Sequence, residues 1–275
     1  MIDAKLKETK AFLTKNRDFQ PPRLGFVLGS GLSGFAKKIK TTAEIPFQDI
    51  PHFARSTVSG HPGKLILGTL EGLPVAVLQG RLHAYEGLTM EQVIYPVRTL
   101  ATLGVKTLIV TNAAGGLKKT MRAGDFMVIR DHINLTGENP LRGENWPGGP
   151  RFVDMTEPYD PVLSRILEES LKKAKVRAHK GVYIGVMGPS YETAAEIKYY
   201  ASIGGGSVGM STVSEVIAAR HAGLKVAGLS CITNLGTGLS KTKLNHEEVK
   251  EVAALVEEKF ARALMTFVVG AKKWF

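Results

Sequence analysis

Cysteine is nearly absent from the sequence, since Cys231 is the only one among 275 residues. One thiol cannot form an internal disulfide, which excludes the small disulfide-stapled folds of secreted proteins. Long apolar runs are absent as well, and none approaches the roughly 20 residues that a membrane helix requires. The N-terminal segment MIDAKLKETKAFLTKN is charged throughout and contains no apolar core of a signal peptide. These absences predict a chain that works in a reducing cytoplasm and does not enter a membrane.

Motifs for nucleic-acid binding are also missing, although the formal net charge is +11. The sequence contains no arginine-rich run, no zinc-finger spacing and no aromatic-rich RNA-binding strand. Its lysines are spread along the chain, so we interpret the charge as a solvated surface whose positive field draws in small anionic substrates. A basic nucleic-acid-binding module is one alternative, and salt-sensitive retention on DNA or RNA would support it.

Length and composition predict one folded domain over residues 1–275. Hydrophobic residues make up 44% of the chain and charged residues 22%, which is ordinary for a globular protein that is not embedded in a membrane. A chain of this length can bury a large core. No composition shift, internal repeat or low-complexity tract marks a boundary between domains.

Apolar patterns predict strands that alternate with helices, and therefore a mixed α/β fold. The expected strands lie at residues 24–28, 64–70, 73–78, 106–111, 126–129, 181–186, 207–209 and 225–233. The expected helices cover residues 2–13, 89–103, 193–203, 212–221 and a long final segment from 245, and capping boxes start the second, third and fourth. Residues 134–161 are rich in Gly, Pro and Asn, which is typical of a loop that is functional or contacts partners.

A glycine-rich turn, GSGLSG at residues 29–34, follows the first of these strands. Such a turn after a buried strand can accept a phosphate group. Gly29, Gly31 and Gly34 also match G-x-G-x-x-G, so a dinucleotide-dependent oxidoreductase is a second alternative. No clear second βαβ unit with an acidic strand end follows at about 20 residues, which favours a chance match or a mononucleotide-type phosphate turn. Stabilisation by NAD or NADP but not by phosphate would support the oxidoreductase.

Arg81, His83 and Tyr85 alternate, so in an extended segment their side chains leave from one face. That face offers a fixed cation, a titratable imidazole and an aromatic hydroxyl. The strand expected at 106–111 then leads into NAAGG at residues 112–116, where we expect a turn whose small residues let the backbone approach a ligand closely. Three polar side chains on one strand face need hydrogen-bonding partners if they are buried. A purely structural role therefore explains this segment less well than a ligand-binding role.

Polar residues follow the ends of several expected strands, where ligands collect in α/β folds. By their chemistry they form three groups. A small tetrahedral anion suits Ser30, Arg81, His83 and Ser211, and a sugar face suits Tyr85 and Met210. A heterocyclic base suits Tyr191, Glu192 and Asn234. The clusters as a set therefore point to a pocket for an anion, a sugar and a base.

Ten motifs occur in order along the chain: GSGL at Gly29, STVSGHPG, QGRLHAYEG, VTNAAGGL, IRDHINL at Ile129, ENPLRG at Glu138, GPSYET at Gly188, VGMSTVSEV at Val208, ITN at Ile232 and NHEEV at Asn245. In these motifs nearly the whole chain resembles the purine nucleoside phosphorylases of the homotrimeric, inosine- and guanosine-cleaving kind. The resemblance implies an α/β fold with a mixed, partly barrel-like central sheet flanked by helices, and an active site at a trimer interface. It also implies reversible phosphorolysis of a purine nucleoside to free base and ribose 1-phosphate, with inorganic phosphate as co-substrate and no metal or cofactor.

The resemblance further implies a role for each residue of the pocket. Phosphate would be held by Ser30, His61, Arg81, His83, Ser211 and the backbone of Ala113. Ribose would contact Tyr85, Met210 and His246, and the purine would contact Tyr191, Glu192, Thr233 and Asn234. Phe152 would be lent by the neighbouring subunit. Within this set we expect four residues to take part in catalysis: Asn234, His83, Glu192 and His246.

The residues at the expected base site favour a 6-oxopurine. The amide of Asn234 can hydrogen-bond N7 and O6 as negative charge moves onto the purine, and Glu192 can accept a hydrogen bond from N1–H. Methylthioadenosine phosphorylases, which act on a 6-aminopurine and usually carry an aspartate at this position, are the closest alternative. Residues 234–238 depart from the bacterial members, which often carry alanines here, and residues 204–206 are unusually rich in glycine. Extra glycine loosens the backbone, so we expect the loop 235–244 to close over the base differently.

Overall fold

The computed structural model describes residues 2–15, 19–57, 62–240 and 246–275, and all of their side chains except those of 246–250. The strands are β1 (Leu24–Leu28), β2 (Lys40–Pro46), β3 (Lys64–Leu70), β4 (Leu73–Gln79), β5 (Thr107–Gly116), β6 (Phe126–Asn134), β7 (Ala178–Gly185), β8 (Gly205–Gly209) and β9 (Lys225–Leu235). The helices are α1 (Ile2–Thr14), α2 (Met90–Leu103), α3 (Pro161–Lys173), α4 (Ala194–Ser202), α5 (Val213–His221) and α6 (His246–Ala271). Among the described helices, none is long and apolar enough to cross a membrane.

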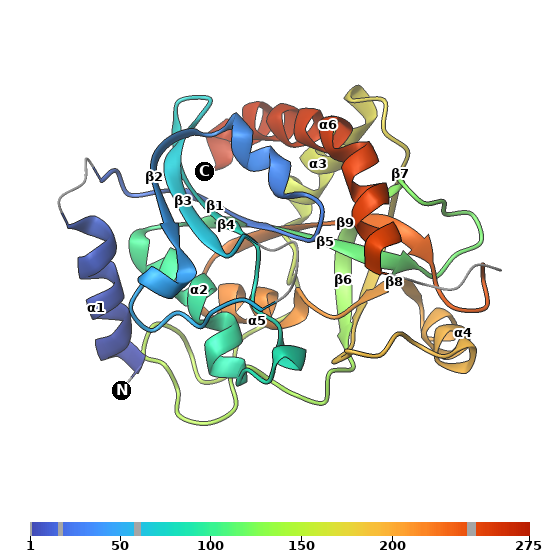
Figure 1. Ribbon diagram of the computed structural model, residues 1–275, viewed down its shortest axis with the longest axis horizontal. Coiled ribbons are helices and arrows are strands. Elements are labelled where there is room, and N and C mark those ends of the chain that lie inside the picture. Colours follow the sequence, from blue (N-terminus) through green and yellow to red (C-terminus); the bar gives the residue numbers. More distant parts are fainter. Residues whose placement is uncertain (1, 16–18, 58–61, 241–245) are drawn as a thin grey trace.

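One continuous mixed sheet connects the strands in the order β2-β3-β4-β1-β5-β8-β7-β6-β9 (Figure 1). The last strand in this order, β9, also pairs in parallel with β5 along most of its length. This additional pairing closes β5, β8, β7, β6 and β9 into a ring, from which β1, β4, β3 and β2 extend as an open arm. The prediction of a mixed, partly barrel-like sheet flanked by helices is confirmed.

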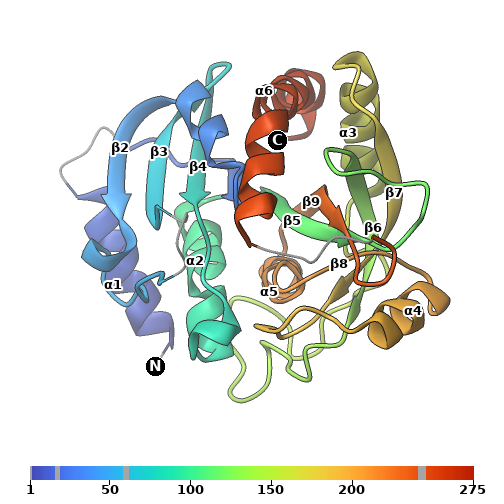
Figure 2. The same cartoon turned by 45° about the vertical axis from the view of Figure 1, so that its right-hand side comes forward.

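Two groups of helices cover the two faces of the sheet (Figure 2). Apolar residues of α1, α2 and α5 build one core, and apolar residues of α3 and α6 build the other. Strand β1 contributes to both, because Val27 belongs to the first core and Phe26 to the second. A strand that is buried on both faces needs an uninterrupted apolar run, and LGFVL supplies one.

Two of the three predicted capping boxes start helices as expected. The Thr89 side chain accepts a hydrogen bond from the backbone N–H of Gln92, and the Gln92 side chain accepts one from the backbone N–H of Thr89 at 2.9 Å. Gly104 adopts φ 116° and ends α2, because this left-handed conformation costs little without a Cβ. Thr193 and Glu196 form the same reciprocal cap at α4. Local sequence signals therefore set the bounds of these two helices.

The capping box expected at Thr212 and Glu215 is wrong. Thr212 adopts φ 71° and its side chain makes no capping hydrogen bond at the start of α5. Its hydroxyl instead accepts a hydrogen bond from Asn112, 100 residues earlier in the chain. The carboxylate of Glu215 turns toward Arg81. The two side chains that would cap the helix therefore form long-range polar contacts.

The sequence patterns did not predict β2 or α3. Strand β2 lies at the edge of the sheet and buries only Ile45, so its sequence KTTAEIP shows no apolar alternation. Helix α3 begins at an ordinary signal, since Asp160 accepts hydrogen bonds from the backbone of Val162 and Leu163 and Pro161 occupies the first turn. Asp160 and Pro161 lie at the end of the irregular stretch 134–161, so they were interpreted as part of that loop and the helix was not predicted.

The turn expected at residues 112–116 is also wrong, because these residues continue β5. Gly115 pairs with Val208 and Gly116 with Ser207 on one side, and the same segment pairs with β9 on the other. A Cβ on Gly116 would lie 3.0 Å from Cγ2 of Ile232, so a larger residue would press on the neighbouring strand. The small residues here let β5 run between β8 and β9.

Candidate active site

A pocket lies at the strand ends of the sheet. Its lining residues come from six separate segments of the chain: Ser30, Arg81, His83, Tyr85, Ala113, Ala114, Gly115, Tyr191, Glu192, Val208, Gly209, Met210, Ser211, Thr233 and Asn234. Of the predicted site residues whose side chains the structure describes, all except Phe152 are in this lining. The structure therefore brings together residues that are far apart in the sequence.

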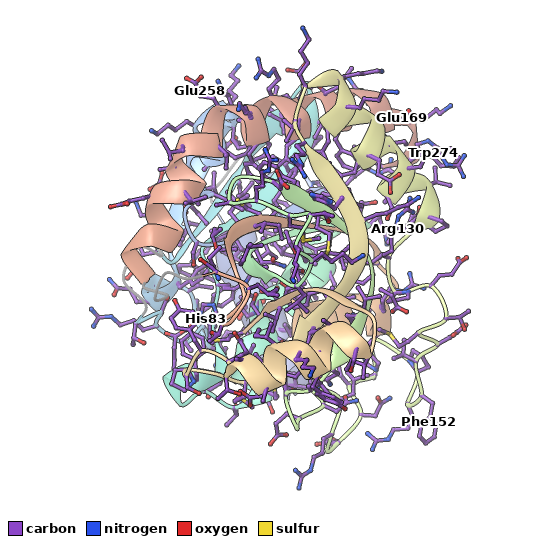
Figure 3. All side chains as sticks on the ribbon, turned by 90° about the vertical axis from the view of Figure 1, so that its right-hand side faces the viewer. His83, Arg130, Phe152, Glu169, Glu258 and Trp274 are labelled. Atoms are coloured by element: carbon purple, nitrogen blue, oxygen red, sulfur yellow. The ribbon has the colours of Figure 1, made fainter. Side chains whose placement is uncertain are left out.

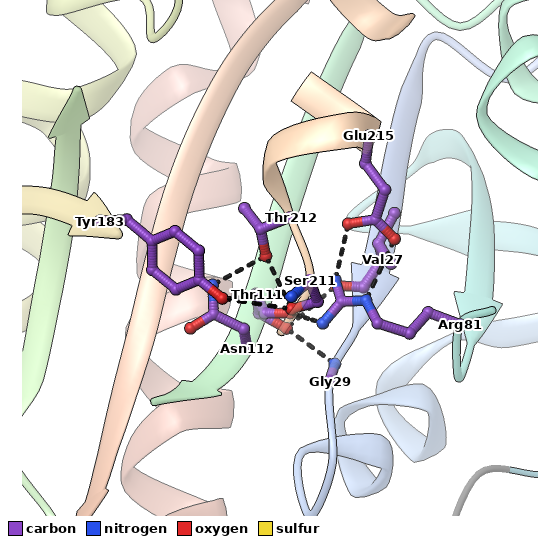
Figure 4. A network of polar contacts seen from close by, with 9 residues as sticks. All are labelled: Val27, Gly29, Arg81, Thr111, Asn112, Tyr183, Ser211, Thr212 and Glu215. Carbon is purple, nitrogen blue, oxygen red and sulfur yellow. Dashed lines mark hydrogen bonds and ion pairs between the residues drawn. The ribbon is translucent and has the colours of Figure 1, made fainter. Parts of the chain in front are cut away.

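Arg81 is 3% exposed and is held by three hydrogen bonds from its guanidinium group (Figure 4). Its Nε and Nη2 donate to Oε1 and Oε2 of Glu215 at 3.0 and 2.9 Å. Its Nη1 donates to the backbone carbonyl of Thr111 at 2.8 Å. A buried cation that is paired in this way avoids the cost of an uncompensated charge, and the plane of the group is fixed.

Gly29 lets the end of β1 lie directly beside β5 and this guanidinium. A Cβ at this position would lie 2.7 Å from Cα of Asn112, 2.8 Å from the carbonyl of Thr111 and 3.2 Å from Nη1 of Arg81. The backbone N–H of Gly29 donates to Oγ1 of Thr111 at 3.2 Å, and that hydroxyl donates to the carbonyl of Val27 at 3.0 Å. Close strand packing thus explains the first glycine of the GSGLSG turn without a dinucleotide.

Ser211 enters the pocket from a buried network of hydroxyl and amide groups at the start of α5 (Figure 4). Its hydroxyl lies 3.2 Å from that of Thr212, which accepts a hydrogen bond from Nδ2 of Asn112 at 2.9 Å. The backbone N–H of Ser211 donates to the hydroxyl of Tyr183 at 3.4 Å. This network fixes the position of Ser211, which follows the end of β8.

His83 is buried and faces a carboxylate. Its Nδ1 lies 3.0 Å from Oε1 of Glu86, which also accepts the backbone N–H of His83 at 2.8 Å. The second oxygen of Glu86 accepts the backbone N–H and the hydroxyl of Thr57, both at 2.7 Å. Burial opposes ionisation of Glu86, yet hydrogen bonds from His83 and Thr57 lower its pKa to about 2. An ionised carboxylate can only accept, so Nδ1 is the donor and Nε2 of a neutral His83 is an acceptor.

The extended segment expected for Arg81, His83 and Tyr85 is not present. Strand β4 ends at Gln79, Gly80 adopts φ 108°, and Ala84–Glu86 forms a 3-10 turn. The three side chains meet in the pocket because the chain folds back, and alternation along a strand is not the cause. Burial, followed by the nearby charge of Glu86, raises the pKa of Tyr85 to about 12, so Tyr85 keeps its hydroxyl proton.

Asn234 and Glu192 lie at another part of the pocket. Oδ1 of Asn234 accepts from the hydroxyl of Thr233 at 2.9 Å, and Nδ2 donates to the carbonyl of Leu235 at 3.2 Å. Each amide atom keeps a second hydrogen-bonding valence for a ligand. Burial raises the pKa of Glu192, and Tyr191 beside it is 41% exposed at the mouth of the pocket.

Two of the glycines near this region, Gly236 and Gly238, lie where the chain packs closely. A Cβ on Gly236 would lie 2.7 Å from Cδ1 of Ile197, and its N–H donates to the carbonyl of Gly116 at 2.9 Å. Gly238 has φ 83°, and its Cβ would lie 2.9 Å from Cβ of Ala194. Both glycines let the chain after β9 pack against α4, behind Tyr191 and Glu192.

Three predicted site residues remain to be placed. His61 lies outside the described residues, and His246 begins α6 but its side chain is also outside the described part. Phe152 is 89% exposed and projects from its loop far from His83 (Figure 3). It lines a different hollow together with His132 and Arg142.

Sequence reasoning missed Glu86, Tyr183 and Glu215, which hold lining residues in place. Glu86 was visible three residues after His83, and Glu215 was interpreted as the end of a capping box. The signal that was available is physical, because a buried arginine needs a carboxylate partner. In the described part of the chain, no cluster of three His, Cys, Asp or Glu side chains could hold a metal ion.

A closed mixed sheet with this pocket is found in a known class of enzymes. Residues 23–269 match the family model of the phosphorylase superfamily, to which the chain belongs. The chain is 47% identical over 265 residues to purine nucleoside phosphorylase 1 of Bacillus subtilis (strain 168), which covers 96% of this chain and 97% of the relative. Two solved structures of Schistosoma purine nucleoside phosphorylase, one with hypoxanthine and one with adenosine, are each 37% identical with a TM-score of 0.90, and each comparison covers 96% of both chains.

Within the superfamily, the chain belongs to the purine nucleoside phosphorylases. These enzymes are pentosyltransferases of purine salvage.

Proposed function

We propose that the protein cleaves 6-oxopurine ribonucleosides and deoxyribonucleosides, such as inosine and guanosine, with inorganic phosphate. The observation that carries this proposal is an amide, Asn234, and a carboxyl, Glu192, in the same pocket as Arg81, His83 and Ser211. One cavity thus offers polar groups for a phosphate and a matched donor and acceptor for a purine. The products are the free base and ribose or deoxyribose 1-phosphate.

Phosphate lies at the end of the pocket that Arg81 and Ser211 define. Ser30, His61, His83 and the backbone N–H of Ala113 complete its site. Nε2 of neutral His83 accepts a hydrogen bond from a protonated phosphate oxygen, while Arg81 donates to the others. The bound anion is thereby oriented for attack on C1′, and its charge stabilises the oxocarbenium-like sugar.

Ribose lies between phosphate and base, against Tyr85, Met210 and His246. As the bond from C1′ to the base breaks, negative charge develops on the purine. Nδ2 of Asn234 donates to O6 or N7, and Glu192 accepts from N1–H. Asn234, His83, Glu192 and His246 are the catalytic residues of this scheme, Thr233 orients the amide of Asn234, and Tyr191 covers the base.

Base preference follows from the amide. A 6-amino group is a donor, so it does not use the free Nδ2 valence of Asn234, and N1 of adenine has no proton for Glu192. A site built to hydrogen-bond a particular group discriminates strongly against an analogue without it. Adenosine is therefore a poor substrate, although a relative has been solved with adenosine bound.

The protein works as one domain in a cytoplasmic homotrimer without a cofactor. Phe152 is 89% exposed in a single chain and points away from its own pocket, which supports a role in the pocket of a neighbouring subunit. The reaction needs no electron carrier or metal, because phosphate is the nucleophile and its negative charge also stabilises the positive charge that develops on the sugar. Neither nucleic acid nor a membrane is a partner.

A nucleoside panel tests the proposal. Release of base from inosine, guanosine and adenosine is measured at saturating phosphate, and kcat/KM is compared. We expect kcat/KM for inosine and guanosine to exceed that for adenosine by at least about 100-fold, because the pocket's polar groups are unpaired with a 6-aminopurine. Equal values for inosine and adenosine would overturn the specificity.

A further inference from the structure

Glu215 holds the guanidinium of Arg81 from outside the pocket. It is 4% exposed, is not among the residues that line the pocket, and offers both carboxylate oxygens to Arg81. Arg81 itself lines the pocket. A change at Glu215 therefore reaches a ligand only through Arg81 and the surrounding structure.

The geometry of this pair is more specific than charge neutralisation requires. Two parallel N–H···O bonds fix the plane of the guanidinium, and the bond from Nη1 to the carbonyl of Thr111 fixes its rotation within that plane. The guanidinium therefore presents its edge to the pocket in one orientation.

Helix α5 couples this pair to the other wall of the anion site. Ser211 lines the pocket just before the helix, and Glu215 lies in its first turn. Thr212 between them is fully buried, has a positive φ of 71°, and accepts a hydrogen bond from Asn112 on β5. One rigid segment thus sets the positions of Ser211 and of the carboxylate that orients Arg81.

We propose that Glu215 is a positioning residue for phosphate, acting through the bidentate contact that orients Arg81. This inference rests on the proposed function, in which Arg81 binds phosphate. Glu215 contributes to the affinity for phosphate and for ribose 1-phosphate, and it does not contribute to recognition of the purine.

Glu215→Asp is the decisive variant because it keeps the buried negative charge while withdrawing the carboxylate by one methylene. We expect KM for phosphate to rise about 10-fold to 100-fold, as the loss of one charge-assisted hydrogen bond implies. KM for inosine should stay within about twofold, since the base groups are untouched. Glu215→Gln removes the negative charge beside Arg81. If the Glu215→Gln variant does not fold, Glu215→Asp alone tests the positioning role.

The pair of Arg130 with Glu168 supplies a matched control. Nε and Nη2 of Arg130 both contact Oε1 of Glu168, which lies on α3 outside the pocket lining. Glu168→Asp should leave the KM for phosphate unchanged. The increase in melting temperature on adding phosphate is a second measurement of phosphate binding, and it does not depend on turnover. Glu215→Asp should make this increase smaller.

Arg81→Lys separates this inference from the assignment of the phosphate site, because it keeps the charge and loses the bidentate contact. In the Arg81→Lys background, Glu215→Asp should change KM for phosphate by less than about twofold, since the two effects share one contact. If Arg81→Lys alone leaves phosphate affinity unchanged, the assigned phosphate site is wrong. If Arg81→Lys weakens phosphate and Glu215→Asp does not, or if KM for inosine rises equally, the positioning role is overturned.

Discussion

The rings of His83 and Tyr85 stack on each other, with centroids 4.6 Å apart and planes inclined by 17°. His83 belongs to the proposed phosphate site, and Tyr85 to the ribose site next to it. A stacked aromatic pair contributes about 0.5–1.5 kcal/mol beyond the area that it buries. The two proposed subsites therefore share a wall, and the ring of Tyr85 helps to hold the imidazole that we assign to the phosphate site.

Substitutions of Tyr85 should separate its hydroxyl from its ring. Tyr85→Phe keeps the stack, so KM for phosphate should not change, while KM for inosine should rise about fivefold through loss of one neutral hydrogen bond. Tyr85→Ala removes the stack as well and should raise both constants. Steady-state kinetics with each substrate varied in turn measures this. The shared wall is refuted if Tyr85→Ala leaves KM for phosphate at the value of Tyr85→Phe.

Asn234→Asp should move the base preference toward adenosine. An aspartate lacks the N–H that donates to O6, and it can accept a hydrogen bond from a 6-amino group. We expect the ratio of kcat/KM for inosine over adenosine to fall at least about 10-fold, the effect of one hydrogen bond to a charged group. An unchanged ratio, measured by base release from both nucleosides, would show that Asn234 does not contact position 6.

Glu86 should contribute to stability in a defined pH range. The contacts of Glu86 lower its pKa from the ordinary value of 4.5 to about 2 in the folded protein. Its contribution is therefore complete above pH 4.5 and is lost as the pH falls through 2. The destabilisation caused by Glu86→Gln should therefore be largest near neutral pH and shrink progressively below pH 4.5. Urea unfolding of both proteins at a series of pH values measures the difference. A destabilisation that stays constant down to pH 3 would contradict the contacts of this carboxylate with His83 and Thr57.

Phe152 should complete the pocket of a neighbouring chain. Phe152→Ala and Asn234→Ala each damage a different part of the proposed shared site. Co-expression of two differently tagged variants yields hetero-oligomers in which some pockets combine an intact Asn234 with an intact Phe152 from the neighbour. These hetero-oligomers should turn over inosine faster than either variant alone, and light scattering should give three times the chain mass of 29.7 kDa. No recovery of activity in verified hetero-oligomers would exclude the shared site.

Local signals made much of the fold predictable. The strand LGFVL, the hairpin of β3 and β4 and the cap of Thr89 with Gln92 each depend on residues within a short window. Strand β2 was missed because an exposed edge strand needs no apolar face, and the length of β5 was underestimated because small residues suggested a turn. Closure of the ring by β5 and β9 depends on segments more than 100 residues apart and was expected only through resemblance.

In the candidate site, too, local features could be predicted from the sequence and long-range contacts could not. The lining residues could be identified because polar groups follow strand ends, whereas the residues that orient them could not. Arg81 and Glu215 are 134 positions apart, so no spacing rule connects them. Glu215 also fits a capping box, and a local interpretation concealed a long-range contact. The glycines at 236 and 238 are explained only by the atoms of α4 that lie against them.

Phosphorus NMR of the protein with inosine and phosphate tests the central claim most directly. If the protein is a phosphorylase with the site described above, a sugar 1-phosphate signal appears in step with hypoxanthine, and no base is released when phosphate is omitted. Release of hypoxanthine at the same rate without phosphate, with free ribose as the second product, would contradict the account.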